Sequence, residues 1–100
     1  MFVMAGSVTF AEAQTSTTTR YASSGYTSVL KGESCTFELF VKSGNKGAGT
    51  LYLKDPYLWH QWDYIYLKGG SYYKRFSNVG SSRAYWKGFA ENSKVRITVD

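Results

Sequence analysis

Short runs in which apolar and polar residues alternate are the clearest pattern along this chain. In residues 34–42 every second side chain, from cysteine through phenylalanine and leucine to valine, is apolar. Residues 94–99 repeat the pattern, with valine, isoleucine and valine on one side and lysine, arginine and threonine on the other. Because successive side chains of a β-strand point to opposite faces, a period of two predicts strands with one buried and one exposed face.

Turn-forming residues separate these runs and suggest how the strands connect. Residues 43–49 (SGNKGAG) predict a turn that pairs residues 34–42 with residues 50–54 as a hairpin. Gly69-Gly70 predicts a second hairpin turn. The expected strands, about seven, lie at residues 21–30, 34–42, 50–54, 60–68, 71–77, 83–89 and 94–99. Short strands at this spacing predict an all-β protein that folds as a sandwich or a small barrel. Of the two we favour a single antiparallel β-sandwich of the jelly-roll or immunoglobulin-like kind.

The composition agrees with a β-rich fold that builds its core from aromatic side chains. The chain has nine Tyr, six Phe and three Trp among its 100 residues, and aromatic residues are enriched in strands. Cys35 is the only cysteine, so no disulfide can form within the chain. Its place in an alternating run predicts a small buried side chain, and an intermolecular disulfide is the alternative.

The first residues resemble a secretory signal peptide. Residues 1–10 (MFVMAGSVTF) are apolar and uncharged, and Ala11-Glu12-Ala13 follows as an A-x-A cleavage site. We therefore expect export with removal of residues 1–13. No Lys or Arg precedes the apolar stretch, which leaves open that Met1 is an internal methionine. The alternative is that these residues form a first strand of the domain.

Removal of the signal would leave a cationic domain. The polar run at residues 14–19 (QTSTTT) predicts a flexible leader, and residues 20–100 form the expected domain. The formal net charge of the chain is +5, and it becomes +6 when Glu12 leaves with the signal. We expect the mature protein to be extracellular, and either released or held non-covalently.

The second half of the chain is similar to small β-sandwich modules that are appended to secreted bacterial enzymes. The residues that carry the likeness are Gly47–Lys54 (GAGTLYLK), Gly69–Tyr73 (GGSYY) and Lys94–Val99 (KVRITV). They place a glycine before an aromatic strand and alternate β-branched residues in the last strand, as in modules of the pre-peptidase C-terminal type. The resemblance implies a β-sandwich over residues 34–100 and implies no particular function.

No arrangement of residues typical of catalysis or metal binding is visible. Hydrolytic catalysis needs a nucleophile with a base, or two carboxylates at a set distance, and His60 is the only histidine. A zinc site would need His60, Cys35 and at least two carboxylates to converge. The glycine-rich run at residues 44–49 lacks the phosphate-binding pattern. We therefore expect no enzymatic activity, no cofactor and no metal site.

Residues 56–66 (PYLWHQWDYIY) hold the densest cluster of aromatic side chains. Binding sites combine apolar walls with a few polar groups, so this cluster predicts an exposed platform for a sugar or a peptide. The candidate contact residues are Trp59, His60, Trp62 and Tyr64. The alternative is that Trp62 and Tyr64 fill the core, while Trp59 caps one end of the fold.

Basic residues concentrate in the second half of the chain. Residues 68–96 contain seven Lys or Arg and a single acidic residue, Glu91. Hairpin pairing would gather much of this charge on one positive face. The residues expected to form it are Lys74, Arg75, Arg83 and Lys87. The alternative is that these charges only keep the protein soluble and its strand edges unpaired.

These features favour a secreted, non-catalytic protein that binds a cell-surface polysaccharide or another extracellular polyanion. Rings between cations also suit nucleic acid bases, but export argues against that partner. One alternative is a bacteriocin-like protein that acts on anionic envelopes and contacts membrane surfaces, although the chain has no amphipathic helix with a basic face. Another is a structural or matrix component that associates through strand edges.

Overall fold

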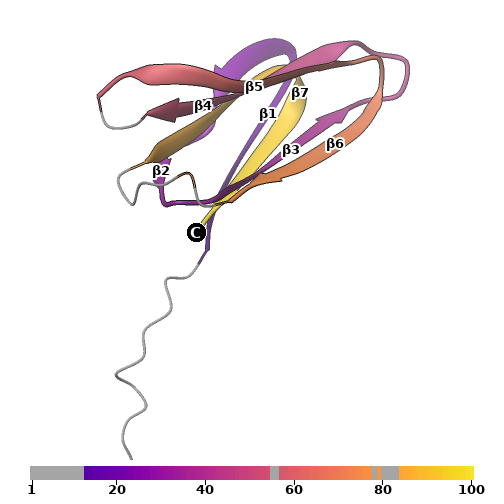
Figure 1. The fold of residues 1–100 in the computed structure, drawn as a ribbon. Coiled ribbons are helices and arrows are strands. Elements are labelled where there is room, and N and C mark those ends of the chain that lie inside the picture. The colour runs from indigo at the N-terminus through magenta and orange to yellow at the C-terminus, as the bar shows by residue number, and fades with distance from the viewer. Residues whose placement is uncertain (1–12, 55–56, 78, 80–83) are drawn as a thin grey trace, which may run out of the picture.

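The computed structural model describes residues 13–54, 57–77, 79 and 84–100, and the regular structure in these residues is antiparallel β-sheet (Figure 1). The seven strands are β1 (Gln14–Tyr26), β2 (Leu30–Lys31), β3 (Cys35–Val41), β4 (Gly47–Lys54), β5 (Trp59–Leu67), β6 (Gly70–Phe76) and β7 (Tyr85–Val99). The prediction of an all-β protein with about seven strands is confirmed. The export signal predicted for residues 1–13 lies outside the described residues, except for Ala13.

The long strand β7 is the centre of the sheet, and its two halves have different neighbours. Residues 85–91 pair with β4 on one side, and with β2 and the end of β1 on the other. Residues 94–99 pair with β3 on one side and with the start of β1 on the other. β5 pairs with β4, and β6 pairs with β3. We call the group around β4 and β5 the β4 half of the sheet, and the group around β3 and β6 the β3 half.

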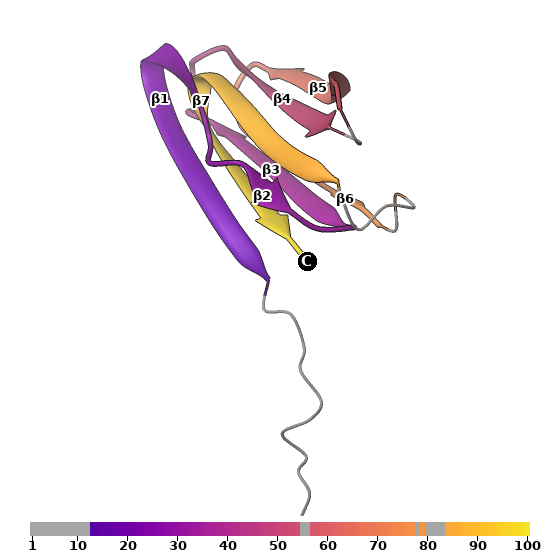
Figure 2. The same cartoon turned by 90° about the vertical axis from the view of Figure 1, so that its left-hand side faces the viewer.

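The sheet bends sharply at the boundary between these two halves. On β7 the bend lies at Asn92 and on β1 at Ala22, which have positive φ values of 48° and 55°. The pairing of β1 with β7 shifts between Arg20 and Ser24. Figure 2 shows β1 along one side of the molecule, with the other strands curling away from it. The sheet is therefore a curled half-barrel, and the sandwich expected from the sequence is not confirmed.

The concave side of the half-barrel holds the core. Two glycines let the halves approach each other: a Cβ at Gly88 would lie 2.6 Å from Val95 Cγ1, and one at Gly49 would lie 2.9 Å from Leu39 Cδ1. The largest fully buried side chains are Trp86, Phe37, Leu39, Leu51 and Ile97. The core is thus built where two parts of the same sheet meet across its bend.

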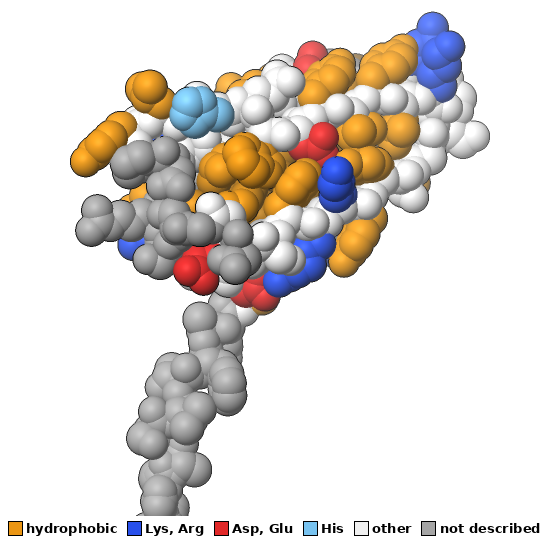
Figure 3. Space-filling view, in the orientation of Figure 1, with side chains coloured by type: hydrophobic (Ala, Val, Ile, Leu, Met, Phe, Trp, Pro, Cys, Tyr) orange, Lys and Arg blue, Asp and Glu red, His pale blue; other side chains and the backbone are white. Residues whose placement is uncertain are grey.

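The two end strands of the sheet, β5 and β6, meet through side chains and not through backbone pairing. The phenol of Tyr72 donates a hydrogen bond to Asp63 Oδ2 at 2.8 Å. The ring centroid of Trp62 lies 6.4 Å from that of Phe76 and 6.4 Å from that of Trp86. Figure 3 shows hydrophobic side chains gathered over this region. We call this set of contacts the β5–β6 seam.

Two predictions about strand pairing are wrong, because pairing in this fold is non-local, and one prediction about strand number is wrong as well. Residues 34–42 and 50–54 do not form a hairpin, since β3 and β4 both pair with β7. The Gly69-Gly70 turn joins β5 to β6, but these strands pair with β4 and β3. The two strands expected at the end of the chain are one strand, because β7 is continuous through the bend.

Residues 14–19 were expected to form a flexible leader, and they instead form the first half of β1. Residues 14–20 pair with residues 93–99 of β7. This pairing uses backbone groups and needs no apolar side chains, and β-branched threonine suits an extended strand. Thr18 lies opposite Val95 and is only 7% exposed. The polar run therefore completes one side of the sheet.

Candidate functional site

A β-bulge on β5 decides which of its side chains lie on which side of the sheet. Gln61 lies opposite Tyr52 and Asp63 lies opposite Leu51, so Trp62 is an extra residue between two paired positions. Directly opposite residues on neighbouring strands share a face of the sheet. Leu51 is fully buried, so Asp63 lies on the concave side. Tyr52 and Gln61 lie on the convex side.

The alternation of β5 and its bulge together separate the four residues that were expected to form an aromatic platform. By the same register, Trp59 and Tyr64 lie on the convex side. His60 lies opposite the buried Leu53 on the concave side, and Trp62 belongs to the seam. Trp62 and Tyr64 are 44% and 47% exposed, so neither is a core residue. The structure therefore does not bring the four residues together on one surface.

Rings and lysines from five strands gather on the convex side of the β4 half. Opposite residues continue from strand to strand, so they form rows across the sheet. One row is Lys31, Tyr85, Lys54 and Trp59, and another is Tyr26, Phe89, Thr50 and Tyr64. We call this surface the aromatic–lysine face; its residues are Tyr26, Lys31, Tyr52, Lys54, Trp59, Tyr64, Tyr66, Tyr85, Lys87 and Phe89.

Lys87 lies among three rings of this face. Its Nζ is 4.4 Å from the ring centroid of Tyr26, 4.4 Å from that of Trp59 and 5.8 Å from that of Tyr52. A cation within about 6 Å of a ring is attracted by the ring quadrupole. The rings of Tyr26 and Phe89 also pack together, with centroids 4.6 Å apart. The ammonium group therefore helps to hold rings from three strands in one arrangement.

The rings of the aromatic–lysine face remain partly open to solvent. Tyr26, Tyr64 and Tyr66 are 50%, 47% and 50% exposed. The Nζ of Lys54 lies 5.9 Å from the ring centroid of Trp59. The face therefore offers apolar contact area next to positive charge.

Sequence reasoning identified Trp59, Tyr64 and Lys87 and missed the other members of this face. Tyr52 could have been found, because it alternates with two buried leucines in strand β4. Tyr26 could not, because it reaches the face only through the long-range pairing of β1 with β7.

The four residues expected to form a positive face are separated as well. Lys74 lies opposite the buried Phe37, at the concave edge of β6. Arg75 lies on the convex side of the β3 half, and Lys87 lies on that of the β4 half. Arg83 lies outside the described residues. The three residues that the structure describes, Lys74, Arg75 and Lys87, therefore lie on three different surfaces.

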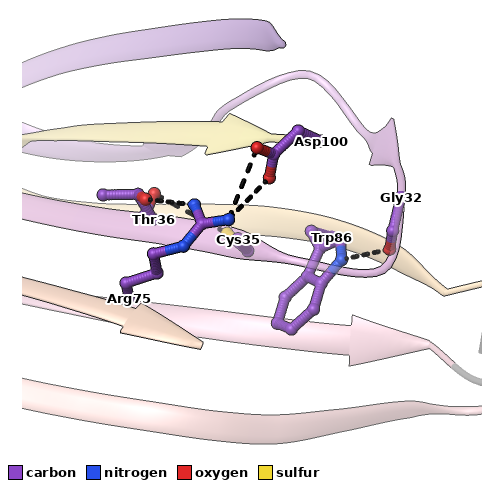
Figure 4. Close-up of polar contacts among 6 residues, drawn as sticks. All are labelled: Gly32, Cys35, Thr36, Arg75, Trp86 and Asp100. Atoms are coloured by element: carbon purple, nitrogen blue, oxygen red, sulfur yellow. Dashed lines mark hydrogen bonds and ion pairs between the residues drawn. The ribbon is translucent and has the colours of Figure 1, made fainter. Parts of the chain in front are cut away.

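Arg75 is held by local contacts (Figure 4). Its guanidinium donates to Thr36 Oγ1 at 3.2 Å and lies 3.2 Å from Asp100 Oδ1. The neighbouring Cys35 is fully buried, and this burial raises the pKa of its thiol to about 12. The predicted core position of Cys35 is confirmed, and Arg75 forms an ion pair with Asp100.

The convex side of the β3 half differs in character from the aromatic–lysine face. Arg96 donates to both carboxylate oxygens of Glu38, at 2.9 and 2.8 Å, and this hydrogen bonding lowers the pKa of Glu38. Phe40 and Tyr73 are 44% and 66% exposed and border a groove of about 270 Å³. The rings of this surface therefore lie beside the Arg96–Glu38 ion pair and beside Lys94, which lines the same groove.

Within residues 13–54, 57–77, 79 and 84–100, no three His, Cys, Asp or Glu side chains are placed to hold a metal ion. A helix long and apolar enough to cross a membrane is also absent from these residues. Comparison with protein-family models, curated proteins and solved structures finds no match. The aromatic–lysine face is therefore interpreted from its own chemistry.

Proposed function

We propose that this protein is a secreted, non-catalytic binding protein that attaches to a cell-surface or extracellular polysaccharide, or to another polyanion. The observation that carries the proposal is the aromatic–lysine face. Exposed clusters of apolar side chains on a small domain are typical of interaction surfaces. Here the cluster is built on paired strands, so its rings occupy fixed positions.

The chemistry of the face matches that of an acidic glycan. The faces of aromatic rings carry negative charge density and attract weakly positive C–H groups, and the faces of a pyranose ring consist largely of such groups. Tyrosine also supplies a hydroxyl that can bond to sugar hydroxyls. Lys31 and Lys54 add positive charge that attracts carboxylate, sulfate or phosphate groups on the polymer.

The N-terminal sequence supports an extracellular role for this surface. The apolar stretch followed by Ala11-Glu12-Ala13 is typical of export signals. The available polyanions outside a cell are wall polymers, acidic glycans and phospholipid headgroups.

The test is retention of the protein on isolated cell walls and insoluble polysaccharides, at about 50 and 500 mM salt. We expect Trp59→Ala and Tyr64→Ala each to weaken retention about tenfold, since central aromatic contacts dominate many interfaces. Tyr73→Ala is the matched control, because Tyr73 is an exposed tyrosine on the convex side of the β3 half. Equal retention of all three variants, each verified as folded, would contradict the proposal.

A second candidate function, action on anionic envelopes, is favoured by one observation. Tyr57 and Leu58 are 81% and 68% exposed and precede Trp59 at one end of β5. Aromatic and aliphatic side chains beside lysines are suited to the membrane interface. The retention experiment together with a growth-inhibition assay separates the candidates. Growth inhibition, combined with retention that disappears at high salt, would favour an envelope-active protein.

A further inference from the structure

A shallow groove of about 590 Å³ lies next to the aromatic–lysine face, along the bend of the sheet. Its floor includes Ala48, a small side chain that lies between Glu91 on β7 and Tyr66 on β5. Tyr64 and Tyr66 line it on the β5 side, and Ser24 lines it on the β1 side. These positions span three strand spacings of about 4.8 Å each. The groove therefore crosses the whole width of the β4 half.

The groove is shaped by the bend, and Asn92 holds the bend in place. The Asn92 Oδ1 accepts a hydrogen bond from the backbone N–H of Ala22 at 2.9 Å. Its Nδ2 donates to the backbone oxygen of Lys46 at 2.7 Å. Asn92 and Ala22 both have positive φ, a conformation that costs non-glycine residues energy. One side chain thus ties β7 to β1 and to the β3–β4 loop, which pre-organises the groove.

The side chains around the groove combine flat rings with free polar groups. Tyr64 and Tyr66 are two residues apart on one face of β5, a separation of about 6.7 Å. Glu91 and Lys46 line the same groove, and both residues are exposed. Among the described residues, neither group has a hydrogen-bond or ion-pair partner. Both remain available to a ligand.

We propose that this groove is a subsite for one uncharged pyranose unit of a polysaccharide. The apolar face of the sugar packs against Tyr64 and Tyr66, and its hydroxyl groups donate to Glu91 and accept from Lys46. Glu91 and Lys46 carry opposite charges, so the groove has no net preference for an anion. The lysines farther along the aromatic–lysine face, in contrast, attract anions. This inference rests on the proposed function and specifies which part of the polymer the bend recognises.

Sugars of the gluco configuration are the simplest probes of such a subsite. All hydroxyls of a β-glucopyranose are equatorial, so both faces of the ring carry C–H groups. An axial hydroxyl, such as the 4-hydroxyl of galactose, stands on one face and leaves only the other free to pack against an aromatic ring. Cellotetraose and chitotetraose are therefore the probes of choice, and β-1,4-galactotetraose is the comparison ligand.

The test is titration of the ¹⁵N-labelled protein with these tetrasaccharides, followed by NMR chemical-shift changes and by calorimetry. We expect saturable shifts at groove residues with cellotetraose or chitotetraose, and weaker binding of galactotetraose, because only one face of each of its rings is free of an axial hydroxyl. Glu91→Gln should weaken binding about tenfold, because it removes a charged hydrogen-bond acceptor. Ser24→Trp should abolish binding by filling the groove. Thr17→Trp, an exposed position on the same strand outside the groove, should bind like the wild type.

The possible outcomes separate this inference from the proposed function. Absence of saturable shifts at the groove, or shifts that persist unchanged in Ser24→Trp, overturns the subsite. If the wild type is still retained on a polysaccharide through Trp59, the proposed function survives that result. If the wild type binds neither tetrasaccharide and is retained on no polysaccharide or cell wall, both proposals fail.

Discussion

Single residues decide which surface the side chains of β5 serve. Trp59 and Tyr64 are five positions apart, so in a strand of regular alternation they would lie on opposite faces of the sheet. The extra residue at Trp62 shifts that alternation. As a result Trp59 and Tyr64 both lie on the convex aromatic–lysine face, while Trp62 packs in the seam against Trp86. A local irregularity in pairing therefore brings two candidate binding residues to one face.

Burial makes the one cysteine chemically inert. Only the thiolate is nucleophilic, and burial raises the pKa of Cys35 to about 12. We expect a thiol reagent such as iodoacetamide to leave the native protein unlabelled at pH 8, and to label one thiol per chain in about 6 M guanidinium. Mass spectrometry measures the labelling. Rapid labelling of the native protein, or a disulfide-linked dimer without reductant, would contradict the buried position.

At the scale of the elements, the bend depends on the absence of side chains at two positions. Gly49 and Gly88 lie on the concave sides of β4 and β7, where the β3 half packs closely against them. Val95 contacts both positions. Because a β-branched side chain has little rotameric freedom, it cannot easily move aside. The close packing of the two halves thus requires glycine.

We expect Gly88→Ala to lower the free energy of unfolding by about 1–3 kcal/mol, the usual cost of overpacking a core. The added methyl group would lie 2.6 Å from Val95 Cγ1 and 3.3 Å from Ile97 Cγ2. Urea denaturation measures the change. Gly25→Ala is the control, because the added group there meets only the flexible end of the Arg20 side chain. An equal effect of the two substitutions would show that the packing across the bend is looser than described.

At the scale of the whole molecule, the half-barrel is held together along the β5–β6 seam. No backbone pairing joins these end strands, so the side chains of Tyr72, Asp63, Trp62 and Phe76 make the contact. Burial, and next the hydrogen bond to Asp63, raise the pKa of Tyr72 to about 12. The neutral phenol is therefore the form that the folded protein favours.

This preference predicts that the seam weakens at alkaline pH. In the unfolded chain a tyrosine ionises near pH 10, whereas the folded protein retains the Tyr72 proton until about pH 12. The stabilisation is fully present below pH 10 and is lost as the pH rises through 12. We expect Tyr72→Phe to lower the free energy of unfolding by about 1 kcal/mol at pH 7, and the difference from wild type to shrink between pH 10 and 12.

Thermal unfolding monitored by circular dichroism at pH 7, 10, 11 and 12 tests the alkaline prediction. Tyr73→Phe is the matched control, because Tyr73 is 66% exposed and lies away from the seam. A difference between wild type and Tyr72→Phe that stays constant across the whole range would contradict the assigned role of this phenol.

The sequence by itself determined the all-β class, the approximate number of strands and the core positions within β3 and the end of β7. These follow from a period of two, which is a local property of an extended chain. The buried position of Cys35 follows for the same reason. The aromatic density of residues 56–66 also pointed to exposed rings, and three of its residues, Trp59, Tyr64 and Tyr66, lie on the aromatic–lysine face.

Only the tertiary structure decided the strand partners, the bend and the membership of the aromatic–lysine face. Pairing joins residues far apart in the chain, as between β1 and β7, and no local pattern encodes it. The bulge at Trp62 exists only relative to β4, so the alternation of β5 alone could not reveal it. Cross-strand neighbours such as Tyr26 and Lys87 meet because the backbone hydrogen bonds of the sheet align them, and that alignment belongs to the fold as a whole.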